Sequence, residues 1–485
     1  MKKVICILLS ALLLSGCVRN PQHNAVVSKN DGSFDTRLVQ SSTEPEPSFK
    51  LLNFYAKEEF MSTDESVSFK MDISESFSVS SVPVVEVVPH NLNGIEAEKI
   101  ARVLFGDVDY YESDPVLAQT YSKSQINLLL TNWARYVNED EMRELYKSSY
   151  EDDIDFVQAL IERFTLLLES ASEENQDRIS SWEMKKESYY IYSEEEANQM
   201  DTSKENDKIS VSLVYKNLPY QFSVTTRNQN DFKINNIRAT LTPNSPADID
   251  YDILRAELCR TDKPTEEELD NVKKQVEHWL SKMDLGAWQV RECNVRTRFV
   301  GDVPEYTIHV NAVPQFCGVA AMYRNQLYNL KSDKAYASNY YLTDANFIFA
   351  PGGELINFEM YSPVDVSDVI TENAVILSTD LLIERAKNYL MLSDMYTYGL
   401  GDSLAECEED MICTVEVVDL DYGLTRVKAP NTDDCYNYVP AITLRGNVNY
   451  TGRTSNSLYY TTEESPAIIL ILNAVDGSVI DHSGI

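Results

Sequence analysis

The spacing of apolar residues switches between two periods along this chain, and this pattern constrains the fold most. Strand-like alternation opens the first half, at Val67, Phe69, Met71 and Ile73. Helical spacing follows, with apolar residues three or four positions apart, as in Ile126, Leu129, Leu130, Trp133 and Val137. Alternation then returns between residues 209 and 241. Helices that are followed by runs of strands with short turns are typical of an α+β domain.

The second half repeats this order. A capping box from Thr265 to Glu268 predicts the start of a helix, and a hairpin is expected from Asn346 to Tyr361 around a Pro-Gly-Gly turn. Residues 243–264 contain three prolines and predict a boundary between the halves. We therefore expect two α+β domains, 51–245 and 246–485, each an antiparallel sheet with helices packed on one face.

One strand of the first domain carries a positional signal. The segment Val82–Val88 is almost wholly apolar but contains Pro83. Proline cannot donate a hydrogen bond to a neighbouring strand, so the segment is expected at the edge of its sheet.

Residues 1–16 have the layout of a bacterial lipoprotein signal peptide. Two lysines precede an apolar run that is shorter than the ~20 residues a spanning helix needs. Leu14-Ser15-Gly16-Cys17 then matches the lipobox pattern L-[AS]-[GA]-C. We predict that Cys17 becomes the N-terminus and carries a diacylglycerol. The alternative is an ordinary secretory signal in which Cys17 has no such role.

The lipobox predicts a location on the outer, extracytoplasmic face of the cell membrane. Residues 17–50 are rich in Asn, Ser, Thr and Pro, and we expect a flexible tether between the lipid and the folded domains. No later apolar run is long enough to cross a bilayer, so membrane contact is expected through the lipid.

The chain is strongly acidic, with 77 Asp and Glu against 42 Lys and Arg and a net charge of −35. Nucleic acid is not an expected partner, because its binding needs a basic surface. A field of this sign attracts cations, including cationic peptides. The alternative is that the charge only keeps a surface protein soluble.

Six of the eight cysteines lie in the second half of the chain, at Cys259, Cys293, Cys317, Cys407, Cys413 and Cys435. An even number in an exported protein permits three disulfides. Cys407 and Cys413 are close in sequence and are the expected local pair. Free buried thiols are the alternative. Because the cysteines form no CxxC and no matching histidine spacing exists, we expect neither zinc nor another metal or cofactor.

Catalytic motifs are absent from the sequence, which contains no GxSxG, HExxH or P-loop. Cys317 with His309 as a base is one candidate nucleophile, provided that a hairpin brings the two within hydrogen-bond reach. A disulfide at Cys317 is the competing interpretation. The acidic stretch 406–410 lacks the DxDxDG pattern and is expected to be solvated rather than to bind calcium. We therefore expect a protein that is not an enzyme.

Tyrosine is abundant, with 29 residues against 4 tryptophans. Exposed tyrosines provide rigid amphipathic contacts on peptide- and sugar-binding surfaces. One segment concentrates them, and we predict a binding loop there, formed by Tyr323, Tyr328, Tyr336, Tyr340 and Tyr341.

The end of the chain carries a resemblance. Tyr438-Val439-Pro440-Ala441 is followed by strands and then by Leu472-Asn473-Ala474-Val475-Asp476-Gly477. This resembles the end of uncharacterised lipoproteins of Gram-positive bacteria and the PepSY-like folds of extracytoplasmic regulators such as the YycH and YycI proteins, which end in a Tyr-x-Pro strand and an Asn-Ala-x-x-Gly hairpin. The resemblance implies an extracytoplasmic module that modulates a membrane sensor.

Together these features predict a non-enzymatic lipoprotein that binds a protein or peptide partner or modulates a sensor. One alternative is a solute- or carbohydrate-binding lipoprotein, which would have a deep cleft between the domains lined by Tyr and Trp. Another is a hydrolase of unrecognised type, which needs converging polar groups with shifted pKa values in a pocket.

Overall fold

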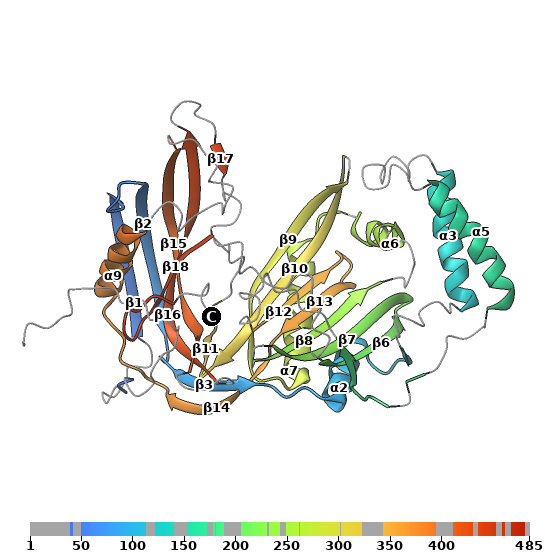
Figure 1. Cartoon of the computed structure of the whole chain (residues 1–485), viewed down its shortest axis with the longest axis horizontal. Coiled ribbons are helices and arrows are strands. Elements are labelled where there is room, and N and C mark those ends of the chain that lie inside the picture. The colour runs from blue at the N-terminus through green and yellow to red at the C-terminus, as the bar shows by residue number, and fades with distance from the viewer. Residues whose placement is uncertain are drawn as a thin grey trace, which may run out of the picture.

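The computed structural model describes residues 39–41, 50–112, 122–139, 154–171, 178–179, 181–188, 205–229, 232–242, 249–260, 262–300, 302–322, 343–393, 411–429, 435–452, 458–460 and 467–480. Its strands form one sheet of eight and one of ten, and helices pack against both (Figure 1). The α+β class expected from the sequence is therefore confirmed. Among the helices in these ranges, none is long and apolar enough to cross a bilayer.

The eight-stranded sheet joins the start of the described chain to its end. Its order is β1-β2-β15-β16-β3-β14, and β17 and β18 also pair with β16. Its strands are antiparallel to their neighbours except for β2 and β15, which are parallel. The strands are β1 (Lys50–Met61), β2 (Val67–Val79), β3 (Val84–Pro89), β14 (Val364–Thr371), β15 (Met411–Lys428), β16 (Tyr436–Gly452), β17 (Leu458–Tyr460) and β18 (Ala467–Asn473).

The ten-stranded sheet is built from the middle of the chain and is antiparallel throughout its described pairs. Its order is β11-β10-β12-β13-β8-β7-β6-β4, with β9 also paired to β10 and β5 to β6. The strands are β4 (Tyr110–Glu112), β5 (Lys185–Ser188), β6 (Glu205–Tyr215), β7 (Leu218–Gln229), β8 (Phe232–Leu241), β9 (Trp288–Val300), β10 (Val303–Phe316), β11 (Val319–Ala320), β12 (Asp344–Phe349) and β13 (Leu355–Tyr361).

The division between the sheets differs from the boundary expected between residues 245 and 246. β8 lies before that point and pairs with β13 after it, with Ala239 opposite Phe358. β2 likewise pairs with β15, with Phe69 opposite Val415. Each sheet therefore takes strands from both halves. The boundary predicted from the sequence missed this pairing. Each strand needs a hydrogen-bonding partner for its backbone, but the spacing of its side chains does not show which distant strand supplies that partner.

Two other expectations need correction. β3 starts at Val84, directly after Pro83, and lies between β16 and β14 rather than at an edge. Because Pro83 stays outside the strand, its missing N–H breaks no ladder bond. The proline-rich segment expected as a boundary contains a helix, α6 (Ile249–Cys259).

One face of the ten-stranded sheet is covered by α2 (Gly94–Phe105) and α7 (Glu266–Met283). Capping boxes at Asn93 and Thr265 satisfy the free backbone N–H groups at their starts. Both helices present an apolar stripe to the sheet, and Trp279 of α7 stacks on Phe349 with 5.8 Å between ring centroids. The main buried contacts come from Ala97, Ile100, Leu104, Val272, Val276, Phe222, Phe347 and Phe358.

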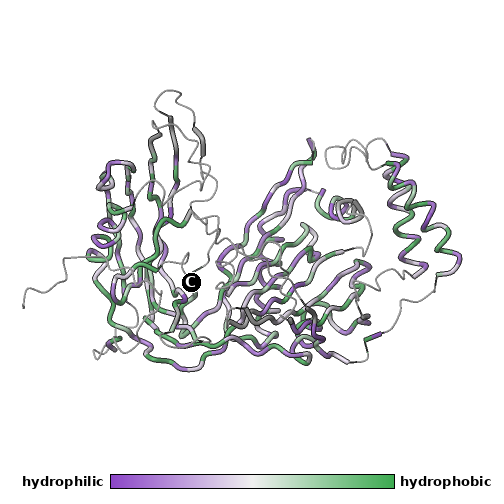
Figure 2. The backbone as a smooth tube through the Cα atoms, viewed as in Figure 1, coloured by the Kyte–Doolittle hydropathy of each residue, from purple (hydrophilic) through white to green (hydrophobic). Residues whose placement is uncertain are grey.

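The eight-stranded sheet has its own core beneath α9 (Thr379–Leu392). Ser378 caps this helix, and Leu382, Ala386 and Leu390 are fully buried against the sheet. Alternation along β2 places Phe69 and Met71 in the same core. Figure 2 shows this alternation of hydropathic colour along strands of both sheets.

A third, smaller cluster forms beyond the ten-stranded sheet. α3 (Lys123–Asn138) packs against α5 (Ile154–Ser170), with Trp133 edge-on to Phe164 at 5.0 Å between ring centroids. Ala256 of α6 joins this cluster, and Arg135 of α3 forms an ion pair with Glu257. The pair of helices is therefore attached to the sheet through α6 (Figure 1).

The two sheets are joined by direct packing. The Met322 backbone N–H donates to the Leu424 carbonyl of β15 at 2.9 Å, and Arg291 of β9 forms an ion pair with Asp421 at 2.8 Å. Gly423 lies in this contact, and a Cβ there would be 2.7 Å from the Met322 side chain and 3.0 Å from the Ala320 carbonyl oxygen. Only glycine fits at this approach.

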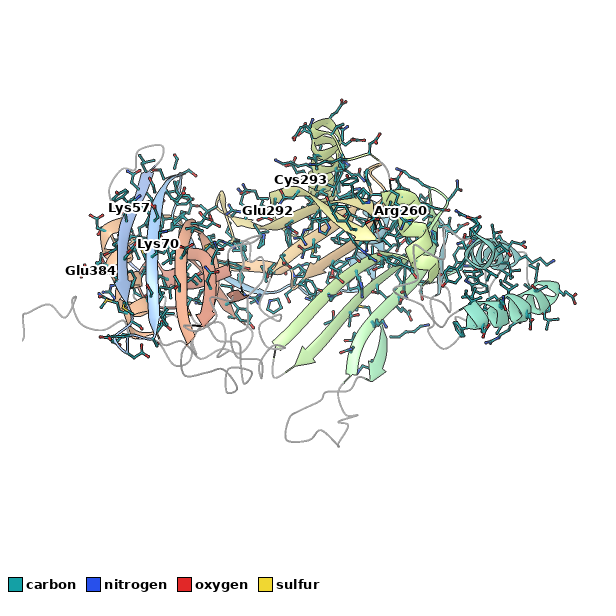
Figure 3. The ribbon with its side chains drawn as sticks, turned by 90° about the horizontal axis from the view of Figure 1, so that it is seen from above. Lys57, Lys70, Arg260, Glu292, Cys293 and Glu384 are labelled. Carbon is teal, nitrogen blue, oxygen red and sulfur yellow. The ribbon has the colours of Figure 1, made fainter. Side chains whose placement is uncertain are left out.

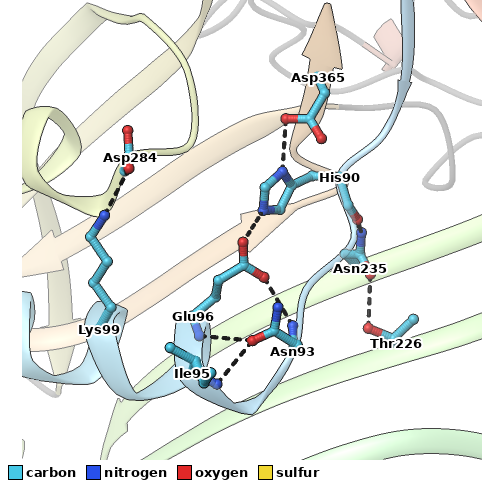
Figure 4. Close-up of polar contacts among 9 residues, drawn as sticks. All are labelled: His90, Asn93, Ile95, Glu96, Lys99, Thr226, Asn235, Asp284 and Asp365. Atoms are coloured by element: carbon cyan, nitrogen blue, oxygen red, sulfur yellow. Dashed lines mark hydrogen bonds and ion pairs between the residues drawn. The ribbon is translucent and has the colours of Figure 1, made fainter. Parts of the chain in front are cut away.

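A polar network forms a second link (Figure 4). His90 follows β3, and its Nδ1 is 2.8 Å from Asp365 Oδ1 of β14 while its Nε2 is 2.9 Å from Glu96 Oε1 of α2. Its carbonyl accepts a hydrogen bond from Asn235 of β8. One residue thus contacts an edge strand of one sheet and both a helix and a strand of the other.

Candidate functional site

The face of the ten-stranded sheet opposite α2 and α7 carries polar side chains in cross-strand rows. Residues that lie opposite each other across neighbouring strands share a face, and one such row runs from β9 to β6. It consists of Asn294, His309, Ile348, Asn357, Thr240, Gln221 and Ser212. The next row on this face consists of Glu292, Asn311, Asn346, Glu359, Arg238, Ser223 and Ser210. Only Ile348 is apolar among these residues.

Side-chain hydrogen bonds link residues within each row, and Arg238 also donates to Thr240 of the neighbouring row at 3.1 Å. Thr240 donates to Asn357 at 3.0 Å, and Arg238 Nε is 3.1 Å from Glu359. Gln221 donates to Ser210 at 3.2 Å. These contacts fix the rotamers of a surface that would otherwise cost side-chain entropy on binding.

Helix α6 lies over one part of this face and forms a cleft with it. The cleft has a volume of about 710 Å³, within the usual size for a ligand site. Strands β8, β10, β12 and β13 form its floor and α6 contributes Tyr251 and Arg255. The described residues that line it are Arg238, Thr240, Leu241, Thr242, Tyr251, Arg255, His309, Ile348, Ile356 and Asn357.

Buried contacts hold α6 in place. Cys259 packs with Ala350 and Ile356. Arg255 and Arg260 both reach Glu305 of β10, at 3.7 and 3.3 Å, and Glu305 is only 3% exposed. Arg260 is labelled in Figure 3, which views the molecule from above. A carboxylate with two guanidinium partners is the electrostatic contact between helix and sheet.

The charged side chains that line the cleft are arginines, and each lies next to a glutamate outside the lining: Arg238 is 3.1 Å from Glu359 and Arg255 is 3.7 Å from Glu305. Among the described residues that line the cleft, none is Asp or Glu. Within the described part of the chain, Arg255 Nε is buried and has no hydrogen-bond partner. A buried donor without a hydrogen bond is uncommon in folded proteins, and here Glu305 Oε2 lies 3.7 Å from it.

His309 lies on the floor of the same cleft. Its Nε2 is 3.0 Å from the Thr307 hydroxyl. Burial, with smaller contributions from the charges of Arg296 and Arg255, lowers the pKa of His309 to about 4. The imidazole is therefore neutral at pH 7 and can either donate or accept a single hydrogen bond at each ring nitrogen.

Several predicted site residues lie outside the described ranges. These are Cys17, Cys407 and the tyrosines Tyr323, Tyr328, Tyr336, Tyr340 and Tyr341. Lipidation, the Cys407–Cys413 pair and the tyrosine loop therefore stay predictions. Cys413 itself is buried on β15.

The structure separates the Cys317–His309 pair. Both lie along β10 and its following turn, eight positions apart, which is roughly 26 Å in an extended strand. Cys317 sits in the turn with φ +48°, whereas His309 faces the cleft. Cys259, Cys293 and Cys317 are free thiols, and burial raises the pKa of all three, that of Cys259 to about 11. In the described ranges, no cluster of His, Cys, Asp or Glu has the arrangement of a metal site.

The cleft arginines were not predicted from the sequence. Arg238 and Thr240 do alternate with Ile237, Ala239 and Leu241, which marks them as facing away from the core. That signal identifies a polar face but not the helix above it, because α6 comes from the segment expected as a boundary.

Comparison with known proteins gives no family. No family model and no curated protein matches the sequence. A solved structure of an uncharacterized protein from Eubacterium rectale ATCC 33656 is similar over 91% of this chain and 96% of that one, with 10% identity and a TM-score of 0.36.

Proposed function

We propose that the protein is a lipid-anchored extracytoplasmic binding protein without catalytic activity, and that a protein or peptide partner docks on the polar face of the ten-stranded sheet. The observation that carries this proposal is the continuous polar face with a cleft beneath α6. A membrane sensor, as the resemblance to extracytoplasmic regulators implies, is one partner of this kind.

The side chains of the face suit a polypeptide. Asn357, Thr240 and Gln221 offer the donors and acceptors that pair with backbone amides. Sugar sites rely on flat aromatic surfaces, and the described lining has Tyr251 alone and no Trp. The cleft also lies on a single sheet and not between the two. A solute- or sugar-binding lipoprotein is therefore the second candidate.

The cleft groups are poorly suited to hydrolysis. A nucleophile needs a base within reach and a suitable pKa. His309 has a pKa of about 4, and Cys259, the thiol of the covering helix, is fully buried with a pKa of about 11. Arginine does not act as a base at neutral pH.

Selection against a peptide library tests the proposal. The full-length lipoprotein in detergent is used to select binders from a phage-displayed random peptide library, and is titrated separately with amino acids and oligosaccharides. We expect peptide binders that are lost in an Asn357→Ala, Gln221→Ala double variant and kept in the control Ser76→Ala, which alters an exposed residue of the other sheet. Saturable binding of a sugar or amino acid without any peptide binder would contradict the proposal.

A further inference from the structure

We propose that the cleft beneath α6 binds a carboxylate, supplied by an acidic side chain of a peptide. This rests on the proposed function, since a peptide partner carries the group. The first observation is charge: the chain has 77 acidic residues, yet the described lining of this cleft contains two arginines and no acidic side chain.

The second observation is the orientation of the donors. Arg238 comes from the sheet and Arg255 from the helix above it, so an anion between them would contact guanidinium groups from two sides. Glu305 Oε2 is 3.7 Å from Arg255 Nε, too far for a hydrogen bond, and this buried atom makes no hydrogen bond among the described residues, although the Arg255 side chain also interacts with Cys259. A planar carboxylate matches the fork of a guanidinium group.

The remaining lining fits the rest of an acidic side chain. Ile348 and Ile356 provide apolar contact for its methylene groups. Thr240 and Asn357, which are hydrogen-bonded to each other, lie on the same floor and can pair with the adjoining peptide amide. A single negative charge at the end of an apolar side chain is the ligand that contacts both the arginines and the isoleucines of this lining.

Binding should be coupled to His309. The charged groups around it are Arg255 on α6, Arg296 on β9, Arg238 on β8, Glu305 on its own strand and Glu359 on β13. An added carboxylate favours the imidazolium, so the pKa of His309 rises on binding. By linkage, affinity increases as the pH falls, over the range above about pH 5 in which a glutamate probe stays ionised.

The test uses the full-length protein labelled with ¹³C at histidine Cε1. Five histidines give a simple NMR spectrum, and His309→Gln assigns the relevant signal. The probes are the peptide Ac-Ala-Glu-Ala-NH₂ and its neutral isostere Ac-Ala-Gln-Ala-NH₂. We expect only the glutamate peptide to shift the NMR signal of His309 and to raise the midpoint of its pH titration.

Variants then locate the contact. Arg238→Gln should weaken binding by about tenfold, because it removes one charge-assisted hydrogen bond. Arg255→Lys keeps a charge beside Glu305 but removes the fork, and should also weaken binding. Arg102→Gln, an equal change of charge on α2 on the other side of the sheet, is the control and should leave binding unchanged.

Other outcomes overturn the assignment. Equal binding of the two peptides would show that the cleft does not recognise the carboxylate. Binding of inorganic phosphate or of oligogalacturonate, but not of the glutamate peptide, would assign the cleft to another anion. If library-selected peptides bind while carboxylates have no effect at His309, only this inference fails. If no peptide binds at all, the proposed function fails with it.

Discussion

Neutralising Glu305 should loosen α6 from the sheet. In Glu305→Gln, Arg255 and Arg260 lose the carboxylate that both contact, while their side chains are only 21% and 17% exposed. Removing one partner of a buried ion pair typically costs 3–5 kcal/mol. Because the arginines keep some contact with water, we expect the lower end, about 3 kcal/mol.

Two measurements check this value. Urea denaturation of the full chain gives the change in free energy of unfolding, and hydrogen exchange gives the protection of α6 amides relative to α7. We expect faster exchange in α6, with α7 unchanged, because α7 packs on the other face through its own apolar stripe.

A triple variant separates charge from packing. Glu305→Met combined with Arg255→Met and Arg260→Met removes all three charges and fills similar volume, so it should be more stable than Glu305→Gln. A loss below 1 kcal/mol in Glu305→Gln, with unchanged exchange in α6, would refute the idea that this carboxylate holds the helix.

Three further predictions concern other parts of the chain. Gly423→Ala should destabilise the protein by about 1–3 kcal/mol in urea denaturation, because its Cβ meets Met322 and the Ala320 carbonyl. Gly352→Ala should be nearly neutral, because its Cβ meets the end of the Glu354 side chain, which can rotate away. Cys17→Ser should abolish palmitate labelling and membrane fractionation, because the thioether forms only on sulfur; unchanged labelling would refute the lipobox interpretation. In native protein at pH 8, iodoacetamide should modify exposed Cys317 well before buried Cys259, whose pKa of about 11 leaves almost no thiolate. Mass spectrometry of the peptides gives the order of modification, and faster modification of Cys259 would contradict the prediction.

Local structure could be read from the sequence where the signal lies within a few residues. The capping box at Thr265 does begin α7, and the hairpin expected from Asn346 to Tyr361 is β12 and β13. The alternation between residues 209 and 241 gives β6, β7 and β8. Each of these signals reflects hydrogen bonds and burial that a short segment determines by itself.

Long-range pairing could not be read in the same way. Nothing in Phe69 or its neighbours specifies that β15 will be the partner of β2. The candidate cleft has the same difficulty, because Arg238 and Arg255 come from different elements and meet only when α6 folds over the sheet. The prolines in residues 243–264 favoured the prediction of a boundary, so α6 was not expected there.

The pairing of β2 with β15 has a consequence for how the chain matures. The ten-stranded sheet lies wholly within the middle of the sequence and can form as soon as β13 is available. β1, β2 and β3 are synthesised first, but β15 and β16, with which they pair, are synthesised last, so the apolar faces of the first strands stay uncovered during most of synthesis. Truncations at the C-terminus should therefore leave the middle sheet foldable and the first strands exposed to proteases and to aggregation.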